Sequence, residues 1–270
     1  MAKNTENKAF FSIITVTLNM LDGLKITEES LINQTCKDYE WIIIDGSSDD
    51  GTKDHLKTTN AKWTSEKDNG IYSAMNKGLE KPTGQYILFL NAGDQLAAPD
   101  TLQNIKNSAA KTPDFIYGDA LEHDTYKPAR NPNIAAGMFT HHQSMFYNRK
   151  ALQDIRYNTD YKIAADYDLT ARFLSDHTHI LYCNFPICIF EEGGLSQTKA
   201  TLGRREQFEI RKKLKLTSPI KNQIITTAQT ILWQFRCWMP SLYWHLKSSG
   251  NMTRANTQTG TPPSHPESPP

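Results

Sequence analysis

Residues 39–52 read YEWIIIDGSSDDGT, and this stretch decides the predicted fold. Tyr39 to Asp45 is an apolar, β-branched run that is typical of a strand buried in a parallel sheet, and it ends abruptly on a carboxylate. Turn-forming and helix-capping residues follow at once, ahead of a short helix predicted near Lys53 to Thr58. A buried strand followed by a polar turn and a helix is the repeating unit of an α/β protein.

The same unit recurs on both sides of this stretch, with no internal sequence repeat. Further strands are predicted over Phe10–Leu18, Ala61–Thr64 and Tyr86–Leu90, and helices over Leu24–Gln34 and Ile71–Glu80. From Lys111 to Leu195 the pattern is less regular, with strands expected in 115–119, 141–147 and 179–190 and a helix over Ala165–Ser175. Strands separated by helices predict a central, mostly parallel, doubly wound sheet flanked by helices.

Composition limits the kind of protein. The 270 residues carry 30 basic and 29 acidic side chains, so the balance of charge gives no reason to expect nucleic acid as a partner. The four cysteines show no zinc spacing and are expected to be reduced thiols. The N-terminus lacks the apolar core of a signal peptide, and no run approaches the ~20 apolar residues of a membrane span. We therefore expect a cytoplasmic protein.

Four regions are expected along the chain: a disordered N-terminus (1–9), the α/β domain (10–196), a basic helical extension (197–247) and a disordered tail (248–270). The extension has no acidic residue between Glu209 and Glu267, and apolar residues from Ile220 to Phe235 recur at helical spacing. Two interpretations stay open. The helix either packs on the α/β domain, or lies as an amphipathic helix on the anionic inner face of the plasma membrane, which would make the protein peripheral there.

Polar residues follow three of the predicted strands directly: TLN at 17–19, DGSSDD at 45–50 and NAGD at 91–94. In open α/β sheets, ligands bind at the carboxyl ends of the strands. Asp45 can accept a hydrogen bond from a base or a ribose, or it can serve the turn. Asp94 can hold Mg²⁺ or Mn²⁺ against a diphosphate, with Gly93 allowing close approach of a phosphate, or it too can be a turn residue.

Other candidate residues lie outside these three turns. The segment SEKDNGIYSAMNKG (65–78) is more polar than a connecting loop requires, which makes Asp68 and Asn76 candidate ligand contacts. Asp166 opens a predicted helix and can act as a general base, or as a carboxylate favoured by the helix dipole. His142 has no partner at zinc spacing, so we expect it to hydrogen-bond a substrate.

Taken in order, these segments resemble the family 2 glycosyltransferases. The similarity rests on SIITVTLN, WIIIDGSSDDGT, SEKDNGIYSAMNKG, GQYILFLNAGD, HHQSMF, AADYDL and EEGGLS, and it covers Phe11 to Ser196. DNGIY-x-AMNKG and LN-x-GD look most like exopolysaccharide enzymes of the colanic-acid type. The resemblance implies a GT-A (Rossmann-like) fold, a UDP- or GDP-sugar donor, a divalent cation and inversion at the anomeric carbon.

The resemblance also implies roles for individual residues. Thr17 and Asn19 would lie near the base, Asp45 would contact base or ribose, and Asp68 would lie near the donor, with Asn76, Asn91, Gly93 and His142 as further donor contacts. Asp94 would hold the metal and Asp166 would be the catalytic base. The GGLS loop would close over the diphosphate, with Arg204 or Arg205 as its charge partner. The acceptor would be a glycan or a lipid-linked oligosaccharide.

Two positions depart from the family pattern: Asn91 replaces the first acid of the metal motif, and Ser73 stands where relatives usually have aspartate. The first departure leaves open a catalytically weak or inactive homologue that acts as a scaffold for polysaccharide assembly. A sugar nucleotidyltransferase is disfavoured, because TLNMLDG after the first strand is not a basic, glycine-rich phosphate loop. A dinucleotide-dependent oxidoreductase is disfavoured, because no G-x-G-x-x-G follows that strand.

Overall fold

The structure is a computed structural model of the 270-residue chain, and it describes residues 8–122, 125–190 and 199–239. The chain divides into two compact units, Met1–Ser218 and Pro219–Pro270. Residues 1–7 of the predicted disordered N-terminus, the predicted disordered tail and the GGLS loop lie outside the described residues.

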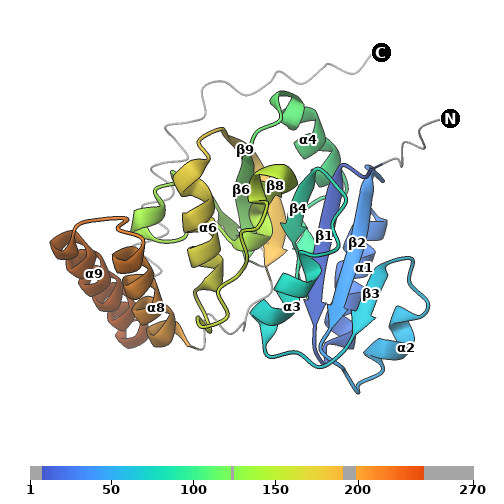
Figure 1. The fold of residues 1–270 in the computed structure, drawn as a ribbon, viewed down its shortest axis with the longest axis horizontal. Coiled ribbons are helices and arrows are strands. Elements are labelled where there is room, and N and C mark those ends of the chain that lie inside the picture. The colour runs from blue at the N-terminus through green and yellow to red at the C-terminus, as the bar shows by residue number, and fades with distance from the viewer. Residues whose placement is uncertain (1–7, 123–124, 191–198, 240–270) are drawn as a thin grey trace, which may run out of the picture. The chain divides into compact units, whose positions relative to one another are not determined.

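A single mixed sheet forms the centre of the first unit (Figure 1). Its strands are β1 (Phe11–Thr17), β2 (Tyr39–Asp45), β3 (Lys62–Ser65), β4 (Tyr86–Phe89), β5 (Gln95–Leu96), β6 (Phe115–Glu122), β7 (Thr125–Lys127), β8 (Met145–Asn148) and β9 (Ile180–Phe190). The spatial order is β3-β2-β1-β4-β8-β6-β9-β5, with β7 paired to β6. The strands β3, β2, β1, β4, β6 and β9 run in one direction, and β8, β5 and β7 run against them.

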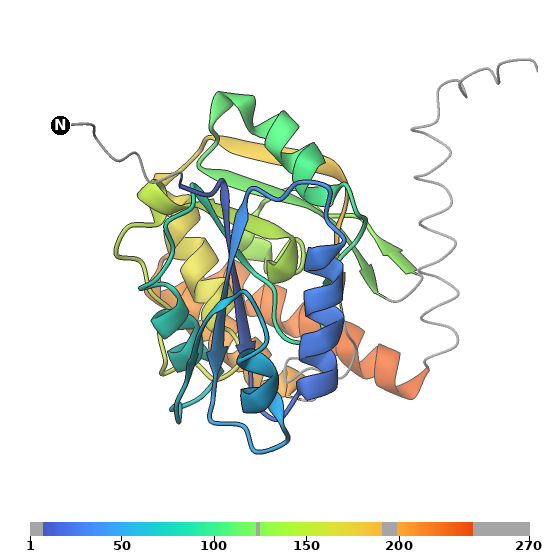
Figure 2. The same ribbon diagram turned by 90° about the vertical axis from the view of Figure 1, so that its right-hand side faces the viewer.

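Helices cover both faces of the sheet. The helices of the first unit are α1 (Leu21–Ile32), α2 (Thr52–Leu56), α3 (Ile71–Gly78), α4 (Thr101–Ser108), α5 (Arg149–Leu152), α6 (Ala165–Asp176) and α8 (Ala200–Lys213), and α9 (Pro219–Trp238) belongs to the second unit. Short 3₁₀ turns, η1 (Ala109–Lys111), η2 (Ile134–Ala136) and η3 (His142–Ser144), lie in the connections. Figure 2 shows α1 and α4 on one face and α3 and α6 on the other.

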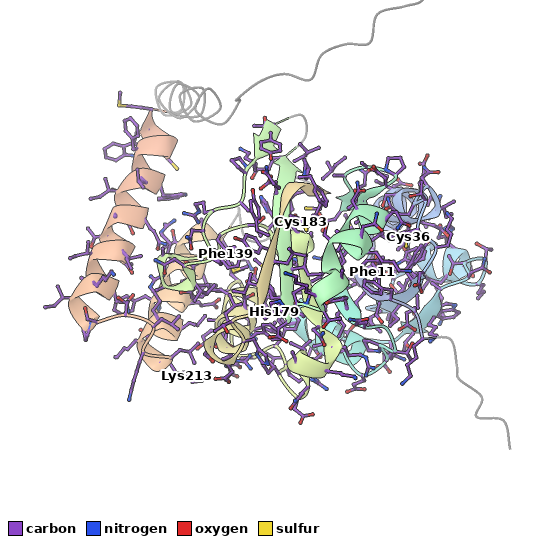
Figure 3. All side chains as sticks on the ribbon, turned by 90° about the horizontal axis from the view of Figure 1, so that it is seen from above. Phe11, Cys36, Phe139, His179, Cys183 and Lys213 are labelled. Atoms are coloured by element: carbon purple, nitrogen blue, oxygen red, sulfur yellow. The ribbon has the colours of Figure 1, made fainter. Side chains whose placement is uncertain are left out.

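Alternation along the strands gives each face its own core. On β1, Ile13 packs with Leu24 of α1, and its neighbour Ile14 packs in the other core with Met75 of α3. All seven residues of β1 are buried, because the strand lies between β2 and β4 and is covered on both sides. In Figure 3, Phe11 and Cys36 lie in the half built from β1–β4, and Phe139 and Cys183 lie in the half around β6 and β9.

The α/β class, the flanking helices and the predominantly parallel sheet are confirmed. One strand prediction is wrong in part: within 141–147 the chain first forms η3, and only Met145–Asn148 is a strand. The apolar run alone did not show where the 3₁₀ turn gives way to the strand. Helix α4 and the short strands β5 and β7 were not predicted, since α4 is polar on average and the two strands have only two and three residues.

The C-terminal helices belong to different units. Helix α8 is part of the first unit and packs on α6, whereas the sequence boundary at 197 assigns it to the extension. Helix α9 belongs to the second unit. Among the described residues, no helix has the length and apolar character that crossing a membrane would require.

Candidate active site

The turns after β1 and β2 are bonded to each other at the carboxyl edge of the sheet. The Asn19 N–H donates to Ser48 Oγ (2.8 Å), and the Asp49 N–H donates to Asn19 Oδ1 (2.9 Å). Asn19 adopts a left-handed backbone (φ 51°), a conformation that asparagine tolerates better than most residues. These bonds bring Thr17, Asn19 and Asp45 to one place, as the sequence predicted.

Asp45 is fully buried and already bonded within the turn. Its carboxylate accepts from the Ser48 N–H and Oγ and from Ser65 Oγ (2.6 Å). The carboxylate therefore fixes the β2 and β3 turns whether or not it also contacts a ligand. Thr17 differs, because its hydroxyl oxygen is buried and has no hydrogen bond within the described part of the chain. Of the two, Thr17 has the hydrogen-bonding capacity to spare for a ligand.

Asp68 lies beside a cation at the start of the third polar segment. Lys77 Nζ is 2.5 Å from Asp68 Oδ1 and 2.8 Å from Glu66 Oε1, and the bond to Asp68 raises the pKa of Lys77. The second oxygen of Asp68 is buried and accepts no hydrogen bond from the described residues. Such an oxygen can take a donor from a bound ligand.

Asn76 is engaged by backbone atoms rather than directed at open space. Its Nδ2 donates to the Tyr157 carbonyl (2.9 Å), and its Oδ1 accepts from the Tyr157 N–H (2.8 Å). This reciprocal pair accounts for the side chain without a ligand. The structure thus gives Asn76 the role of joining α3 to the segment before α6, in place of the donor contact that the resemblance implied.

The turn after β4 carries Asp94 into the interior, where it is 4% exposed. Gln143 Nε2 donates to Asp94 Oδ2 (2.8 Å). Gly93, at φ 99°, forms the turn, and its N–H donates to the Gly23 carbonyl of α1 and to Thr27 Oγ1 (both 3.0 Å). The close approach at Gly93 is therefore to α1, since a side chain at Gly23 would lie 3.1 Å from the Gly93 nitrogen.

A chain of polar contacts runs from this turn to the predicted base. Asn91 Nδ2 lies 3.3 Å from His142 Nε2, and His142 Nδ1 lies 3.7 Å from Asp166 Oδ2. With Asn91 donating to Nε2, the neutral imidazole carries its proton on Nδ1, facing Asp166. Asp166 Oδ1 accepts from the Tyr167 N–H at the first turn of α6. Segments about 50 and 75 residues apart thus meet at one site.

Burial sets the protonation states of this pair. It raises the pKa of Asp166 to about 6 and lowers the pKa of His142 to about 4, because desolvation disfavours the charged form of each. At neutral pH the carboxylate is therefore mostly ionised and the imidazole neutral. A carboxylate with a pKa close to the working pH suits a general base.

Asp168 does not share this position. Arg172 binds its Oδ2 through Nε (2.9 Å) and Nη2 (2.7 Å), and the side chain of Asp168 is 3% exposed. The two carboxylates therefore have different partners, Arg172 for Asp168 and the Tyr167 N–H for Asp166. Sequence reasoning missed Gln143, although it lies inside the quoted HHQSMF motif, and it missed Glu206, for which no motif gave a signal.

The residues around Asp94 fit a hard divalent cation. Asn91 Oδ1 and Gln143 Oε1, both close to Asp94 in the same turn network, are buried oxygens without a hydrogen bond from the described residues. Mg²⁺ and Mn²⁺ take oxygen ligands and combine one or two carboxylates with phosphate oxygens. Within the described ranges no three His, Cys, Asp or Glu side chains form a metal-binding group, so a cation here would depend on amide and phosphate oxygens.

Comparison with known sequences places this geometry in a family. The sequence profile of the glycosyl transferase family 2 matches residues 12–175, more than half of the chain. A PGL/p-HBAD biosynthesis glycosyltransferase of Mycobacterium tuberculosis is 33% identical over 204 residues, covering 70% of this chain and 79% of that protein. The putative teichuronic acid biosynthesis glycosyltransferase TuaG of Bacillus subtilis is 33% identical over 97 residues, 34% of this chain and 38% of that protein.

Solved structures share the fold at low sequence identity. S. aureus TarS 1-349 in complex with UDP-GlcNAc superposes with a TM-score of 0.66 at 16% identity, covering 84% of this chain and 73% of that one. Mannosyltransferase PcManGT from Pyrobaculum calidifontis, in complex with GDP-Man and Mn²⁺, gives 0.60 at 15% identity, covering 92% and 81%. With the sheet, the carboxyl-edge site and the family match in agreement, this chain is a glycosyltransferase that belongs to family 2 and has the GT-A fold.

Proposed function

We propose that the chain is an inverting glycosyltransferase that moves a sugar from a nucleoside diphosphate sugar to a hydroxyl group of a glycan or lipid-linked acceptor. The observation that carries the proposal is the contact chain Asn91–His142–Asp166, which joins the Asp94 turn to a carboxylate with a pKa of about 6. The structural neighbours that hold UDP-GlcNAc or GDP-Man with Mn²⁺ support a nucleotide-sugar donor and a divalent cation.

The transfer is a single displacement. Asp166 Oδ2 takes the proton of the acceptor hydroxyl, whose oxygen attacks the anomeric carbon from the face opposite the diphosphate. The bond from the anomeric carbon to the diphosphate oxygen breaks, and its electron pair leaves with the nucleoside diphosphate. The Nδ1–H of His142 faces the carboxylate at 3.7 Å, a polar neighbour beside the proton-accepting oxygen. A divalent cation bound by Asp94 would supply charge stabilisation to the leaving diphosphate.

The donor site would extend from Asp94 along the carboxyl edge to β3. Thr17 and Asp68 have buried oxygens with no hydrogen bond from the described residues, and Asn19 and Asp45 shape the turns beside them. This edge offers acceptors for the N–H and O–H groups of a base and a ribose. The cationic Lys77 beside Asp68 adds a positive charge.

Thermal unfolding with a panel of nucleoside diphosphates and sugar nucleotides, with and without Mn²⁺, tests the proposal. We expect one base to stabilise the protein, by about 2.7 kcal/mol at a hundredfold excess over Kd, and Mn²⁺ to increase the effect. Release of that diphosphate on adding acceptor, with an inverted anomeric centre by NMR, would complete the test. If no nucleotide raises the unfolding temperature, a non-catalytic scaffold becomes the better account of this chain.

Helix α9 supports a contact with a membrane surface. It contains no acidic residue, and Ile220, Ile224, Ile231, Phe235 and Trp238 fall within one face at 100° per residue. Apolar residues on one face and basic residues without acids are the pattern of a helix that lies on an anionic bilayer. A chain held at a membrane surface would have access to a lipid-linked acceptor.

Sedimentation with lipid vesicles tests this contact. The full chain is expected to pellet with vesicles rich in phosphatidylglycerol and to remain in solution with phosphatidylcholine alone, because each basic residue near an anionic surface contributes about 1 kcal/mol. A chain that ends at Ser218 is the control and is expected to stay in solution with both. If the shortened chain pellets as the full chain does, α9 is not the anchor.

A further inference from the structure

The segment directly before the proposed base is bound by a buried carboxylate from a distant helix. Glu206 of α8, 8% exposed, accepts three backbone N–H groups: Lys162 to Oε1 (2.8 Å), Ile163 to Oε2 (2.9 Å) and Ala164 to Oε2 (2.8 Å). Ala164 is the N-cap residue of α6, and Asp166 follows two residues later. The three bonds therefore fix the entry into the helix that carries Asp166.

Helix α3 holds the same segment from another direction. Tyr72 Oη donates to the Ile163 carbonyl (2.7 Å), so the peptide groups of Ile163 are bound by α3 and by α8. The ring of Tyr72 also stacks on Tyr157 at 5.4 Å, and Asn76 binds the Tyr157 backbone through two hydrogen bonds. The DNGIYSAMN motif thus serves, through Tyr72 and Asn76, to place the segment that leads to the base.

Packing between α8 and this segment is tight enough to be specific. A Cβ atom built on Gly203 would lie 3.0 Å from Ile163 Cγ2, closer than most carbon contacts allow. Ile210, one turn beyond Glu206, packs in a small core with Ala164 and Tyr167. Helix α8 therefore lies directly against the start of α6, with Glu206 at the contact.

We propose that Glu206, together with Tyr72, is a positioning residue for the general base, holding the 162–164 backbone so that the Asp166 carboxylate faces the acceptor site. The inference rests on the proposed role of Asp166 as the base. A buried carboxylate that accepts three N–H groups forms stronger hydrogen bonds than a neutral acceptor in the same place would. A displacement of about 1 Å at a reacting group can lower a rate about 10²-fold, so this support bears on catalysis as well as on folding.

Glu206 also acts on Asp166 through its charge. Desolvation is the main cause of the raised Asp166 pKa, and the negative charge of Glu206 raises it further. The other titratable groups around Asp166 are His141 and His142 at η3, Tyr72 of α3, Tyr147 of β8 and Tyr157 before α6. Among these described groups only Glu206 has a carboxyl side chain, and replacing it by glutamine removes the charge that raises the Asp166 pKa.

Glu206→Gln is the central test, with Glu209→Gln, the same change at an exposed site of α8, as its matched control. We expect Glu206→Gln to lower kcat about 10–100-fold with little change in the donor KM. Because the negative charge is gone, the Asp166 pKa falls below its wild-type value, and the acidic limb of the rate profile moves to lower pH. Glu209→Gln is expected to leave both kcat and the acidic limb unchanged.

Amide hydrogen exchange at Ile163 and Ala164 gives a second readout that needs no substrate. Protection at these amides is expected to fall in Glu206→Gln and to persist in Glu209→Gln. Tyr72→Phe removes one hydrogen bond and keeps the ring stack, and it is expected to lower kcat about 3–10-fold. This variant replaces Glu206→Gln as the test if Glu206→Gln does not fold.

The outcomes separate the two proposals. The positioning role would be overturned if Glu206→Gln left both the amide protection and the acidic limb of the rate profile unchanged. If Glu206→Gln does not fold, an unchanged kcat in Tyr72→Phe would overturn it. If the wild-type protein transfers no sugar but its Ile163 and Ala164 amides lose protection in Glu206→Gln, the carboxylate holds the segment as inferred and the proposed transferase mechanism is what fails.

Discussion

Replacing Asp166 by asparagine is expected to lower kcat about 10²–10⁴-fold, the usual range for loss of a general base. Asparagine has nearly the same shape, and its amide oxygen can still accept from the Tyr167 N–H, so the start of α6 should be preserved. Binding of the nucleoside diphosphate should not change, because the proposed role of the carboxylate is to accept a proton from the acceptor hydroxyl and not to bind the donor. Single-turnover kinetics and calorimetric Kd measurements distinguish these two effects.

The pH dependence of the wild-type transfer rate is an independent test of which group acts as the base. Transfer requires the ionised carboxylate, so the rate should fall as the pH drops through about 6, the raised pKa of Asp166. A fall in rate near pH 4 would instead indicate His142, because burial lowers the pKa of its imidazole to about 4. Because the folded pKa of Asp166 lies above its unfolded value of 3.8, ionising it lowers folding stability above pH 6. Asp166→Asn should therefore raise the unfolding temperature at pH 8 and not at pH 4.

Asp176→Asn is the control, since this aspartate is exposed at the other end of α6. It should show wild-type kcat and a wild-type acidic limb. If Asp166→Asn retained more than a tenth of the wild-type kcat, Asp166 would not be the base, and the aspartate would be left with the structural role of a carboxylate at a helix N-terminus.

Replacing Asp94 by asparagine is the second large effect that we expect. The carboxylate is 4% exposed and accepts a hydrogen bond from Gln143, and the buried amide oxygens of Asn91 and Gln143 receive no hydrogen bond from the described part of the chain. If it holds the cation, Asp94→Asn should abolish the Mn²⁺-dependent part of nucleotide stabilisation and lower kcat about 10²–10³-fold, the effect of losing one group that stabilises transition-state charge. Asparagine keeps the size of the side chain and an acceptor for Gln143.

Two measurements check this expectation. Thermal unfolding with the preferred diphosphate, with and without Mn²⁺, reports binding, and initial rates over a range of Mn²⁺ concentrations report catalysis. Asp100→Asn, at an exposed site before α4, is the matched control and should behave as wild type. An undiminished Mn²⁺ effect in Asp94→Asn would show that the cation is held by other groups, or that the transfer does not use one at this turn.

The sequence predicted the strands of the sheet well where a few consecutive residues carry the pattern. The strands at 11–17, 39–45 and 86–89 are continuous apolar runs, and burial on both faces leaves such runs few alternatives. The polar turns that follow them were placed at one edge because parallel strands end on the same side. Asp45 and Asp94 were candidates on that basis, with a turn role as the alternative, and Asp166 was a candidate because it opens a predicted helix, with a helix-terminal role as the alternative.

The contacts between segments were not predictable in this way. Asn76 looked like a donor contact because it lies in a polar motif, but its amide is bonded to the Tyr157 backbone 81 residues away. Gly93 looked like a phosphate-binding glycine, and its N–H is bonded to α1. Gln143 was missed although it lies in the HHQSMF motif, and Glu206 lies in no motif, since the importance of both comes from what they contact across 49 and about 43 residues of chain.

The sequence by itself thus determined the α/β class, the edge of the sheet that carries the candidate site, and the side chains proposed to serve there, because hydrophobic periodicity and turn chemistry act over a few residues. Only the tertiary structure decided which of those side chains are free to act. The pKa of Asp166 depends on its burial and on Glu206 from another helix, and the Asp94 turn is completed by Gln143 from another strand connection. Desolvation and hydrogen bonding depend on distances in space, which the order of residues along the chain does not contain.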